Sequence, residues 1–152
     1  MANLAAVVGI GQTKYMTKRL DVSIAGLVRE AAVNALQDAD LTWDDIDAVI
    51  LGKAPDMFEG VIMPETYLTD ALGCNGKPML RVHTAGSVGG STALVAASHV
   101  QSGMFKRVLT VSFEKQSESN AMWALSNPQP FSTHLNAGAG GYFAPIIREY
   151  MR

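Results

Sequence analysis

The stretch that decides the fold runs from residue 83 to residue 91 and reads His-Thr-Ala-Gly-Ser-Val-Gly-Gly-Ser. The short run 79–83, Met-Leu-Arg-Val-His, leads into it, and a longer run of small and apolar residues follows it as far as Gly103. This order predicts a strand at 79–83, a turn rich in glycine and serine, and a helix that begins near Ser87.

The same alternation extends to both sides of this stretch. The run 4–10 is continuously apolar and ends in Gly-Ile-Gly, which is typical of a strand buried on both faces. The other expected elements are strands at 48–51 and 107–113 and helices at 22–36, 64–72 and 143–151. This βαβαβαβ order predicts an α/β fold with a mainly parallel sheet and helices on both of its faces.

Composition excludes several classes of protein. The 152 residues are 48% hydrophobic and 17% charged, which is ordinary for one globular domain. With 12 basic and 14 acidic residues the net charge is −2, so no basic excess favours nucleic-acid binding. The single cysteine, Cys74, excludes an internal disulfide and a zinc site of several cysteines, which fits a cytoplasmic location. The longest mostly apolar stretch, 92–100, is too short to span a bilayer and is expected to be a buried core helix.

A ligand site is expected where the strand 79–83 meets the following helix. Ligands of open parallel sheets bind at the carboxyl ends of the strands. His83 lies at such an end, and Ser87 lies at the start of the helix. Gly86, Gly89 and Gly90 would let a ligand approach the backbone closely, and the unpaired amides of a helix start attract a carbonyl oxygen or an anion.

The sequence from Ser87 to Leu94 resembles the nucleophile motif of the thiolase superfamily and the helix that follows it. Three other stretches resemble that family in the same order: 9–13, its opening strand and turn; 41–52, its second helix–strand junction; and 111–115, the end of its fourth strand. The branch it is most similar to is the lipid-transfer or sterol-carrier type, whose members are acetyl-CoA acetyltransferase-like. The resemblance covers nearly the whole chain.

This resemblance implies a thiolase-like layered α/β fold, of which the chain would carry only the N-terminal half. Residues 1–114 would form an incomplete α/β core with a mainly parallel mixed sheet, and 115–152 would begin the family's loop region. Full thiolases have a second half with a catalytic His in a Gly-His-Pro-like motif and a second Cys in a Cys-x-Gly motif. Neither motif occurs in these 152 residues, so the chain alone is expected to be inactive.

The function that the resemblance implies is acyl transfer on acyl-CoA thioesters, by Claisen condensation or thiolytic cleavage. Coenzyme A thioester would be the substrate, and no metal or covalently bound cofactor is expected. Two alternatives remain open: an aldolase that cleaves β-hydroxyacyl-CoA of the steroid side-chain type with a zinc-ribbon/OB-fold partner, and a non-catalytic acyl-CoA-binding subunit. A homodimer or larger oligomer is expected, through residues 79–82.

Ser87 stands where the family has its nucleophilic cysteine. A helix dipole stabilises a charge by about 0.3–1 kcal/mol, and one pKa unit corresponds to about 1.4 kcal/mol, so the dipole alone cannot ionise an alcohol. Ser87 would need a base, and His83 is the local candidate. A helix cap, a nucleophile and a polar contact to the acyl group are all open roles for Ser87, as a structural role is for His83. The expected substrate contacts are Gly86, Val88, Gly89, Gly90 and Glu114.

Two further motifs are expected to carry no chemistry. Cys74 lies in the loop before residue 79, away from the reactive position, and should be an inert thiol. The Gly9-Ile10-Gly11 run is followed by Lys14 where a dinucleotide-binding fingerprint needs a third glycine, which argues against NAD binding.

Overall fold

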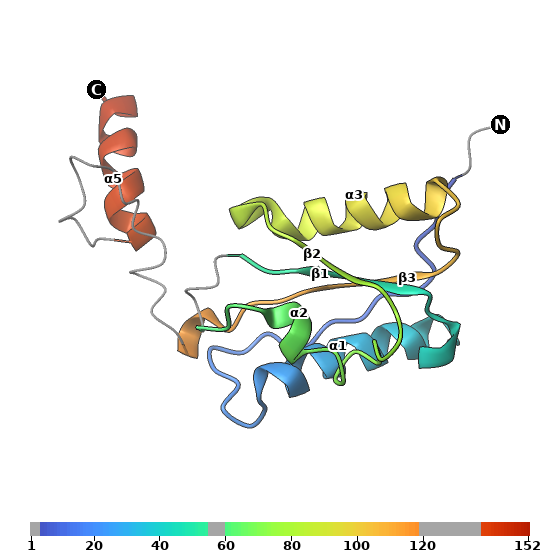
Figure 1. Ribbon diagram of the computed structural model, residues 1–152. Helices are drawn as coiled ribbons and strands as arrows, with labels where there is room; N and C mark the ends of the chain where they lie inside the picture. The colour runs from blue at the N-terminus through green and yellow to red at the C-terminus, as the bar shows by residue number, and fades with distance from the viewer. Residues whose placement is uncertain (1–3, 55–59, 119–137) are drawn as a thin grey trace.

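The computed structural model describes residues 4–54, 60–118 and 138–152 (Figure 1). Its sheet has three parallel strands in the order β2-β1-β3. The strands are β1 (Ala48–Gly52), β2 (Met79–Val82) and β3 (Val108–Ser112). The α-helices are α1 (Ile24–Asp38), α2 (Pro64–Tyr67), α3 (Val88–Gln101) and α5 (Gly138–Tyr150), and the short 3-10 turns are η1 (Trp43–Asp45), η2 (Ala85–Ser87) and η3 (Gln116–Glu118).

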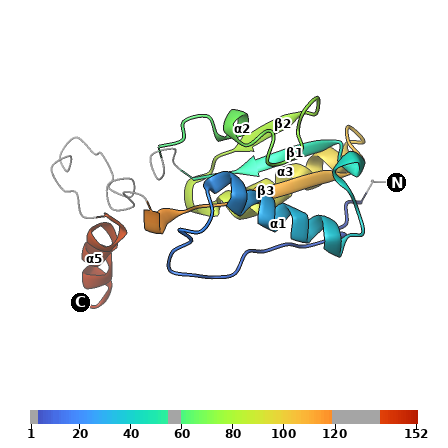
Figure 2. The same ribbon diagram turned by 90° about the horizontal axis from the view of Figure 1, so that it is seen from below.

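The sheet lies between two helical layers. Helix α3 covers one face, and α1 and α2 lie on the other (Figures 1 and 2). The expected parallel sheet with helices on both faces is therefore confirmed, and the three strands fall within one residue of their predicted ends. No helix in the described parts of the chain has the length and apolar character needed to cross a membrane.

Strand β1 forms the centre of the core. Residues Ala48 to Leu51 are 0% exposed, because β2 and β3 flank the strand and helices cover both faces. An apolar strand without alternation is what such a position requires. Asp47, just before β1, accepts hydrogen bonds from the backbone N–H groups of Lys106 and Arg107 at 2.7 and 2.9 Å, and its own N–H donates to the Arg107 carbonyl. These bonds fix the register between the starts of β1 and β3.

Helix α1 begins where its sequence predicts. Ser23 is the N-cap, and its hydroxyl accepts a hydrogen bond from the Gly26 N–H at 3.1 Å. The helix buries one apolar face against the sheet, formed by Leu27, Val28, Ala32 and Leu36. Asp21, two residues before the N-cap, binds Arg19 at 2.9 Å.

The prediction of a buried strand at 4–10 is wrong. The segment is extended but pairs with no strand in the described parts of the chain, and its side chains are exposed: Leu4 is 87% and Val7 is 84% exposed. The apolar pattern marks a segment suited to burial, but the neighbouring strand that would bury it is absent from the three-stranded sheet.

Two predicted helices have different bounds. Helix α2 ends at Tyr67 rather than at residue 72, and the chain continues in turns. Helix α5 begins at Gly138, five residues earlier than expected, and includes Gly140 and Gly141. Residues 119–137, half of the expected loop region 115–152, lie outside the described residues.

Helix α3 is less buried than its sequence predicts. Only Val88, Thr92 and Ala96 are buried, and Leu94 is 71% exposed. The helix therefore packs on the sheet along one face, and its other face is exposed among the described residues. The expectation of an enclosed core helix is wrong for this chain.

Candidate functional site

The predicted site stretch forms the junction between β2 and α3. After β2 the chain makes the 3-10 turn η2 and enters α3 with Ser87 as its N-cap. Ser87 is thus at the head of the helix, as expected. Its hydroxyl does not cap the helix, however, because it donates to the Thr84 carbonyl at 2.8 Å.

A residue with a left-handed backbone conformation lies in this junction. Ala85 has a φ of +48°, a conformation that costs a residue with a Cβ about 1–2 kcal/mol. The Thr84 hydroxyl donates to the Ser91 hydroxyl at 2.8 Å and links the turn to the first turn of α3. Such strain persists only where neighbouring contacts impose it, and it is concentrated at functional sites.

The helix head is open to an incoming ligand. Gly86, Gly89 and Gly90 are exposed, and a Cβ added to any of them would meet no atom within 4 Å. Val88, by contrast, is buried under the helix and faces the sheet side. The Val88 N–H donates to the Ala85 carbonyl of η2. The next amides of α3 have no acceptor within the helix, as at every helix start, and they are the backbone donors that a ligand can reach through this opening.

His83 follows β2 directly and is exposed. Within the described residues no hydrogen bond joins it to Ser87, whose hydroxyl is turned towards Thr84. The structure thus brings the two predicted catalytic residues to the same edge of the sheet but does not pair them.

Glu114 follows β3 at the same edge of the sheet. Its carboxylate accepts a hydrogen bond from the Ala54 N–H and lies 3.3 Å from the Lys53 ammonium. The Lys53 side chain is 0% exposed and its ammonium lies 5.7 Å from the centre of the Phe113 ring. Lys53 was not predicted from the sequence. The only indication in the sequence is that this charged residue directly follows the glycine that ends β1.

A hollow of about 470 Å³ adjoins Glu114, between the loop after residue 11 and the end of β3. Lys115 holds this loop, because its ammonium donates to the carbonyls of Arg19 and Val22 at 2.9 and 2.8 Å. Arg19 in turn binds Glu30 of α1 at 2.7 Å. The guanidinium of Arg19 also lowers the pKa of Asp21 below its ordinary value. The hollow does not reach residues 83–91.

Cys74 is buried in the core, at 2% exposure. Desolvation raises the pKa of its thiol to about 11, and Lys77 opposes this shift. A thiol that stays protonated at neutral pH is a poor nucleophile, which agrees with its expected inertness. The part of the chain that the structure describes holds no group of three or more side chains arranged to bind a metal ion.

No protein-family model matches the chain. The chain is 29% identical to an acetyl-CoA acetyltransferase of Methanothermobacter thermautotrophicus, over 96% of its own length and 39% of the relative's. Its structure resembles that of 3-oxoacyl-(acyl-carrier-protein) synthase III from Aquifex aeolicus VF5, with a TM-score of 0.58, 25% identity, and coverage of 66% of this chain and 32% of the other.

A second solved structure, the Ltp2-ChsH2(DUF35) aldolase, matches 94% of this chain and 33% of the other, with a TM-score of 0.56 and 22% identity. The chain thus spans between about a third and two fifths of the length of the proteins it matches. The shared fold is a partial thiolase-like fold, and over most of its length the chain is similar in sequence to acetyl-CoA acetyltransferases.

Proposed function

We propose that this chain supplies the thioester-binding helix of a thiolase-like enzyme that acts on acyl-CoA and makes or breaks a carbon–carbon bond. The observation that carries the proposal is the open head of α3, where Ser87 and three unobstructed glycines lie at the carboxyl edge of a parallel sheet. The sequence likeness supports the substrate class, because the relative over most of this chain is an acetyl-CoA acetyltransferase.

The helix-start amides perform the central task in this proposal. Two of them point at the thioester oxygen and stabilise the negative charge that develops on it when the carbonyl is attacked or an enolate forms. One such donor is worth about 2.7–4 kcal/mol in a preorganised site. Gly89 and Gly90 contribute by leaving the acyl group room to approach, since nothing lies within 4 Å of their Cβ positions.

Whether the Ser87 hydroxyl can transfer its proton to a base decides which reaction the site favours. To accept an acyl group, its hydroxyl must lose a proton to a base, and His83 is the nearby candidate. The hydroxyl donates to the Thr84 carbonyl instead. An acyl-enzyme on Ser87 therefore requires a change of rotamer that brings it to His83, whereas oxyanion stabilisation by the amides requires none.

This hydrogen bond favours a second candidate function, an aldolase that cleaves a β-hydroxyacyl-CoA without an acyl-enzyme. The structural likeness to the Ltp2-ChsH2(DUF35) aldolase agrees with it. In that case we propose a zinc-ribbon/OB-fold protein as the partner. For either reaction we propose that these 152 residues alone give no turnover, because the motifs expected of a second half are missing from them.

A dimer through β2 is part of the proposal. Strand β2 pairs only with β1 in the described sheet, so its other edge is available to a second copy, and Leu80 on it is 43% exposed. Two such edges would form a continuous sheet across the dimer. Sedimentation of the protein as a monomer at all concentrations would contradict this.

The experiment measures acyl-CoA binding and turnover by the longest natural polypeptide that contains these residues. We expect acetyl-CoA to bind in calorimetry. CoA-dependent thiolysis that is lost in Ser87→Ala supports the acyltransferase, whereas CoA-independent aldol cleavage that persists in Ser87→Ala supports the aldolase. Binding without any product supports a non-catalytic subunit. The control is Ser98→Ala, an exposed serine of α3 away from its head, and absence of binding in the wild type refutes the proposal.

A further inference from the structure

The carboxyl ends of the three strands meet at Lys53. This residue directly follows β1, and its backbone N–H donates to the carbonyl of Val82, the last residue of β2, at 3.5 Å. Its ammonium lies 3.3 Å from the carboxylate of Glu114, the second residue after β3. Lys53 thus joins the end of the central strand to the ends of both of its neighbours.

The Glu114 carboxylate makes these contacts with both of its oxygens. One oxygen accepts a hydrogen bond from the Ala54 N–H, and the other faces the Lys53 ammonium. The bond to Ala54 extends the pairing of β1 with β3, in which the Phe113 N–H donates to the Gly52 carbonyl at 3.2 Å. We call the group formed by Lys53, Ala54 and Glu114 the edge clamp.

Stability alone is a poor explanation for a charged pair at this position. The Lys53 side chain is 0% exposed and the Glu114 side chain is 18% exposed. Removing two charges from water costs free energy that their attraction often only offsets, and apolar residues of similar volume frequently replace a buried ion pair without loss. Apolar residues could not supply an acceptor for the N–H of Ala54, which is buried at 7% exposure.

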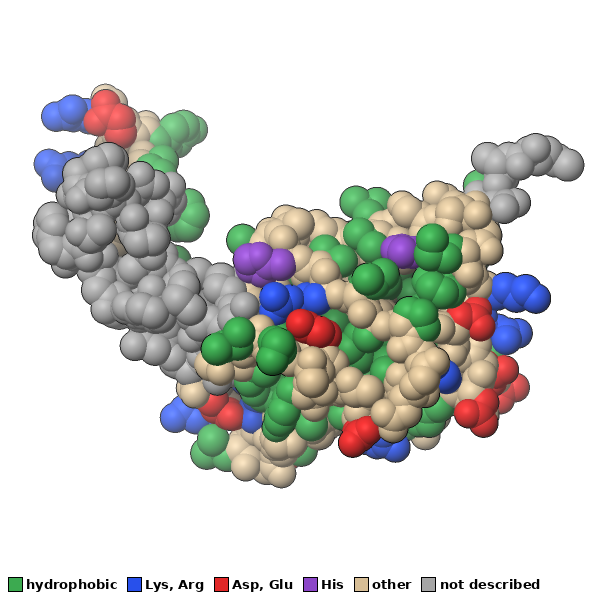
Figure 3. All heavy atoms as spheres, viewed as in Figure 1, with side chains coloured by type: hydrophobic (Ala, Val, Ile, Leu, Met, Phe, Trp, Pro, Cys, Tyr) green, Lys and Arg blue, Asp and Glu red, His purple; other side chains and the backbone are tan. Residues whose placement is uncertain are grey.

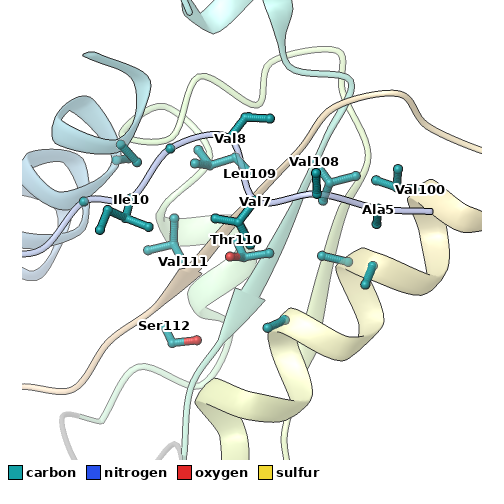
Figure 4. A pocket seen from close by; sticks show the side chains of 18 of the residues that line it. Ala5, Val7, Val8, Ile10, Val100, Val108, Leu109, Thr110, Val111 and Ser112 are labelled. Carbon is teal, nitrogen blue, oxygen red and sulfur yellow. The ribbon is translucent and has the colours of Figure 1, made fainter. Parts of the chain in front are cut away.

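The edge clamp is connected to the head of α3 in two ways. The end of β1 lies below the start of α3 (Figure 1), where Gly52 packs against Thr92. The Ser112 side chain turns from β3 towards β1 and α3 (Figure 4). On the other side, Val82 leads within three residues into η2, the turn from which the helix starts. The clamp therefore fixes both the surface under the helix head and the strand end that precedes it.

We propose that Lys53 and Glu114 are positioning residues of the thioester site, because the edge clamp holds the end of β1 in the place that aims the first amides of α3. The inference rests on the proposed function, since it concerns the same helix head. Glu114 acts in it through the backbone of Ala54 and not by contact with a substrate. Donors that stabilise a developing charge must lie within hydrogen-bond distance of it, and a displacement of about 1 Å can lower a rate about 100-fold.

The test compares two double variants of the longest natural polypeptide that contains these residues. Both remove the ammonium by Lys53→Met. Glu114→Gln keeps an oxygen that can accept from the Ala54 N–H, whereas Glu114→Leu removes it. Neither double variant leaves one charge of the pair buried without the other, so they differ chiefly in this acceptor. Lys53→Met/Glu114→Ala, which also lacks the acceptor, replaces the leucine variant if the latter does not fold.

Amide hydrogen exchange measures the placement of the helix head without any ligand. In Lys53→Met/Glu114→Leu we expect exchange of residues 92–96 to accelerate by about tenfold, while Val49–Leu51 exchange as in the wild type. In whichever of the two reactions the wild type shows, kcat should fall by about tenfold or more with KM changed by less than about threefold, because misplaced donors lose more in the transition state than in the bound substrate. Lys53→Met/Glu114→Gln should recover the exchange rate and kcat to within about threefold.

Asp47→Ala is the matched control. It removes a carboxylate that binds backbone N–H groups at the opposite end of the same two strands, so it weakens the sheet away from the helix head and should leave kcat unchanged. The inference is overturned if the two double variants show the same exchange at 92–96 or the same kcat, or if Asp47→Ala reproduces the effects of Glu114→Leu. A wild type that neither binds nor converts acetyl-CoA refutes the proposed function, and hydrogen exchange then still decides whether the clamp holds the helix head.

Discussion

Gly52 at the end of β1 lies directly against Thr92 of α3: a Cβ added to Gly52 would be 2.3 Å from the Thr92 hydroxyl oxygen. It would also be 2.4 Å from that of Ser112. Thr92 is 1% exposed and its hydroxyl donates to the Val88 carbonyl at 2.7 Å, so it cannot turn outward. The absence of a side chain at residue 52 therefore sets how closely α3, and with it the candidate site, approaches the sheet.

Gly52→Ala is expected to destabilise the fold by about 1–3 kcal/mol, the usual cost of overpacking a close contact. Urea denaturation followed by circular dichroism measures the change. Gly89→Ala is the matched control: its Cβ has free space, so it should leave stability unchanged or raise it by up to about 1 kcal/mol. Equal effects of the two changes would show that the contact with Thr92 is unimportant.

Asp47→Ala should weaken the junction between β1 and β3. The carboxylate of Asp47 accepts two hydrogen bonds from backbone N–H groups, and these bonds lower its pKa. Since the folded-state pKa is depressed, the stabilisation is present above the unfolded pKa of about 4 and is lost as pH falls through the folded pKa. For this exposed carboxylate we expect a loss of about 1 kcal/mol at pH 7 that disappears in acid.

Asp44→Ala is the control for that experiment, because Asp44 is exposed in the neighbouring turn η1. Denaturation midpoints measured at a series of pH values from 7 downward should differ most between the two variants at pH 7 and converge as the pH falls through the folded pKa of Asp47. A difference that stays constant with pH would mean that the Asp47 charge contributes nothing.

The Cys74 thiol should react slowly in the native protein. Because burial raises its pKa to about 11, Ellman's reagent at pH 8 should label it roughly 100-fold or more slowly than in urea. Native Cys74 retains its proton where the unfolded thiol loses it, so its contribution to stability falls as pH rises from about 8.5 to 11. Cys74→Ala should lack this part of the pH dependence. Rapid labelling of the folded protein would contradict the burial.

Arg19→Ala should release the loop that borders the hollow near Glu114. Arg19 binds Asp21 at 2.9 Å and Glu30 at 2.7 Å, and its side chain is only 12% exposed. Without these bonds trypsin should cut after Lys14 and Lys18 several-fold faster, as mass spectrometry of timed digests would measure. Arg152→Ala, at the exposed end of α5, is the control and should leave both rates unchanged.

The apolar face of α5 can be examined in the same digests. Figure 3 shows apolar side chains along one side of this helix, and Phe143, Ile146 and Ile147 are 52%, 55% and 53% exposed. Arg148 lies within this helix. Cleavage after Arg148 reports how stable this helix is.

The three strands of the sheet and the start of α3 were predictable because their signals are local. An apolar run such as 48–51 specifies a buried strand, and the glycines and serines of 83–91 specify the turn into α3. The run 4–10 carries the same signal, yet it forms no strand here, because a strand also needs a neighbour and the sequence of one segment does not contain it. Lys53 was missed because its burial depends on Glu114, which lies 61 residues away.

The central position of β1 has a consequence for synthesis on the ribosome. Both of its neighbours come later in the chain, and Ser112, which pairs opposite Gly52, follows it by 60 residues. At a translation rate of about 5–20 residues per second, the most apolar segment of the protein waits roughly 3–12 s for its second partner. During this time Val49–Leu51 of the nascent chain are exposed and accessible to chaperones. The yield of folded protein should therefore depend on the rate of translation.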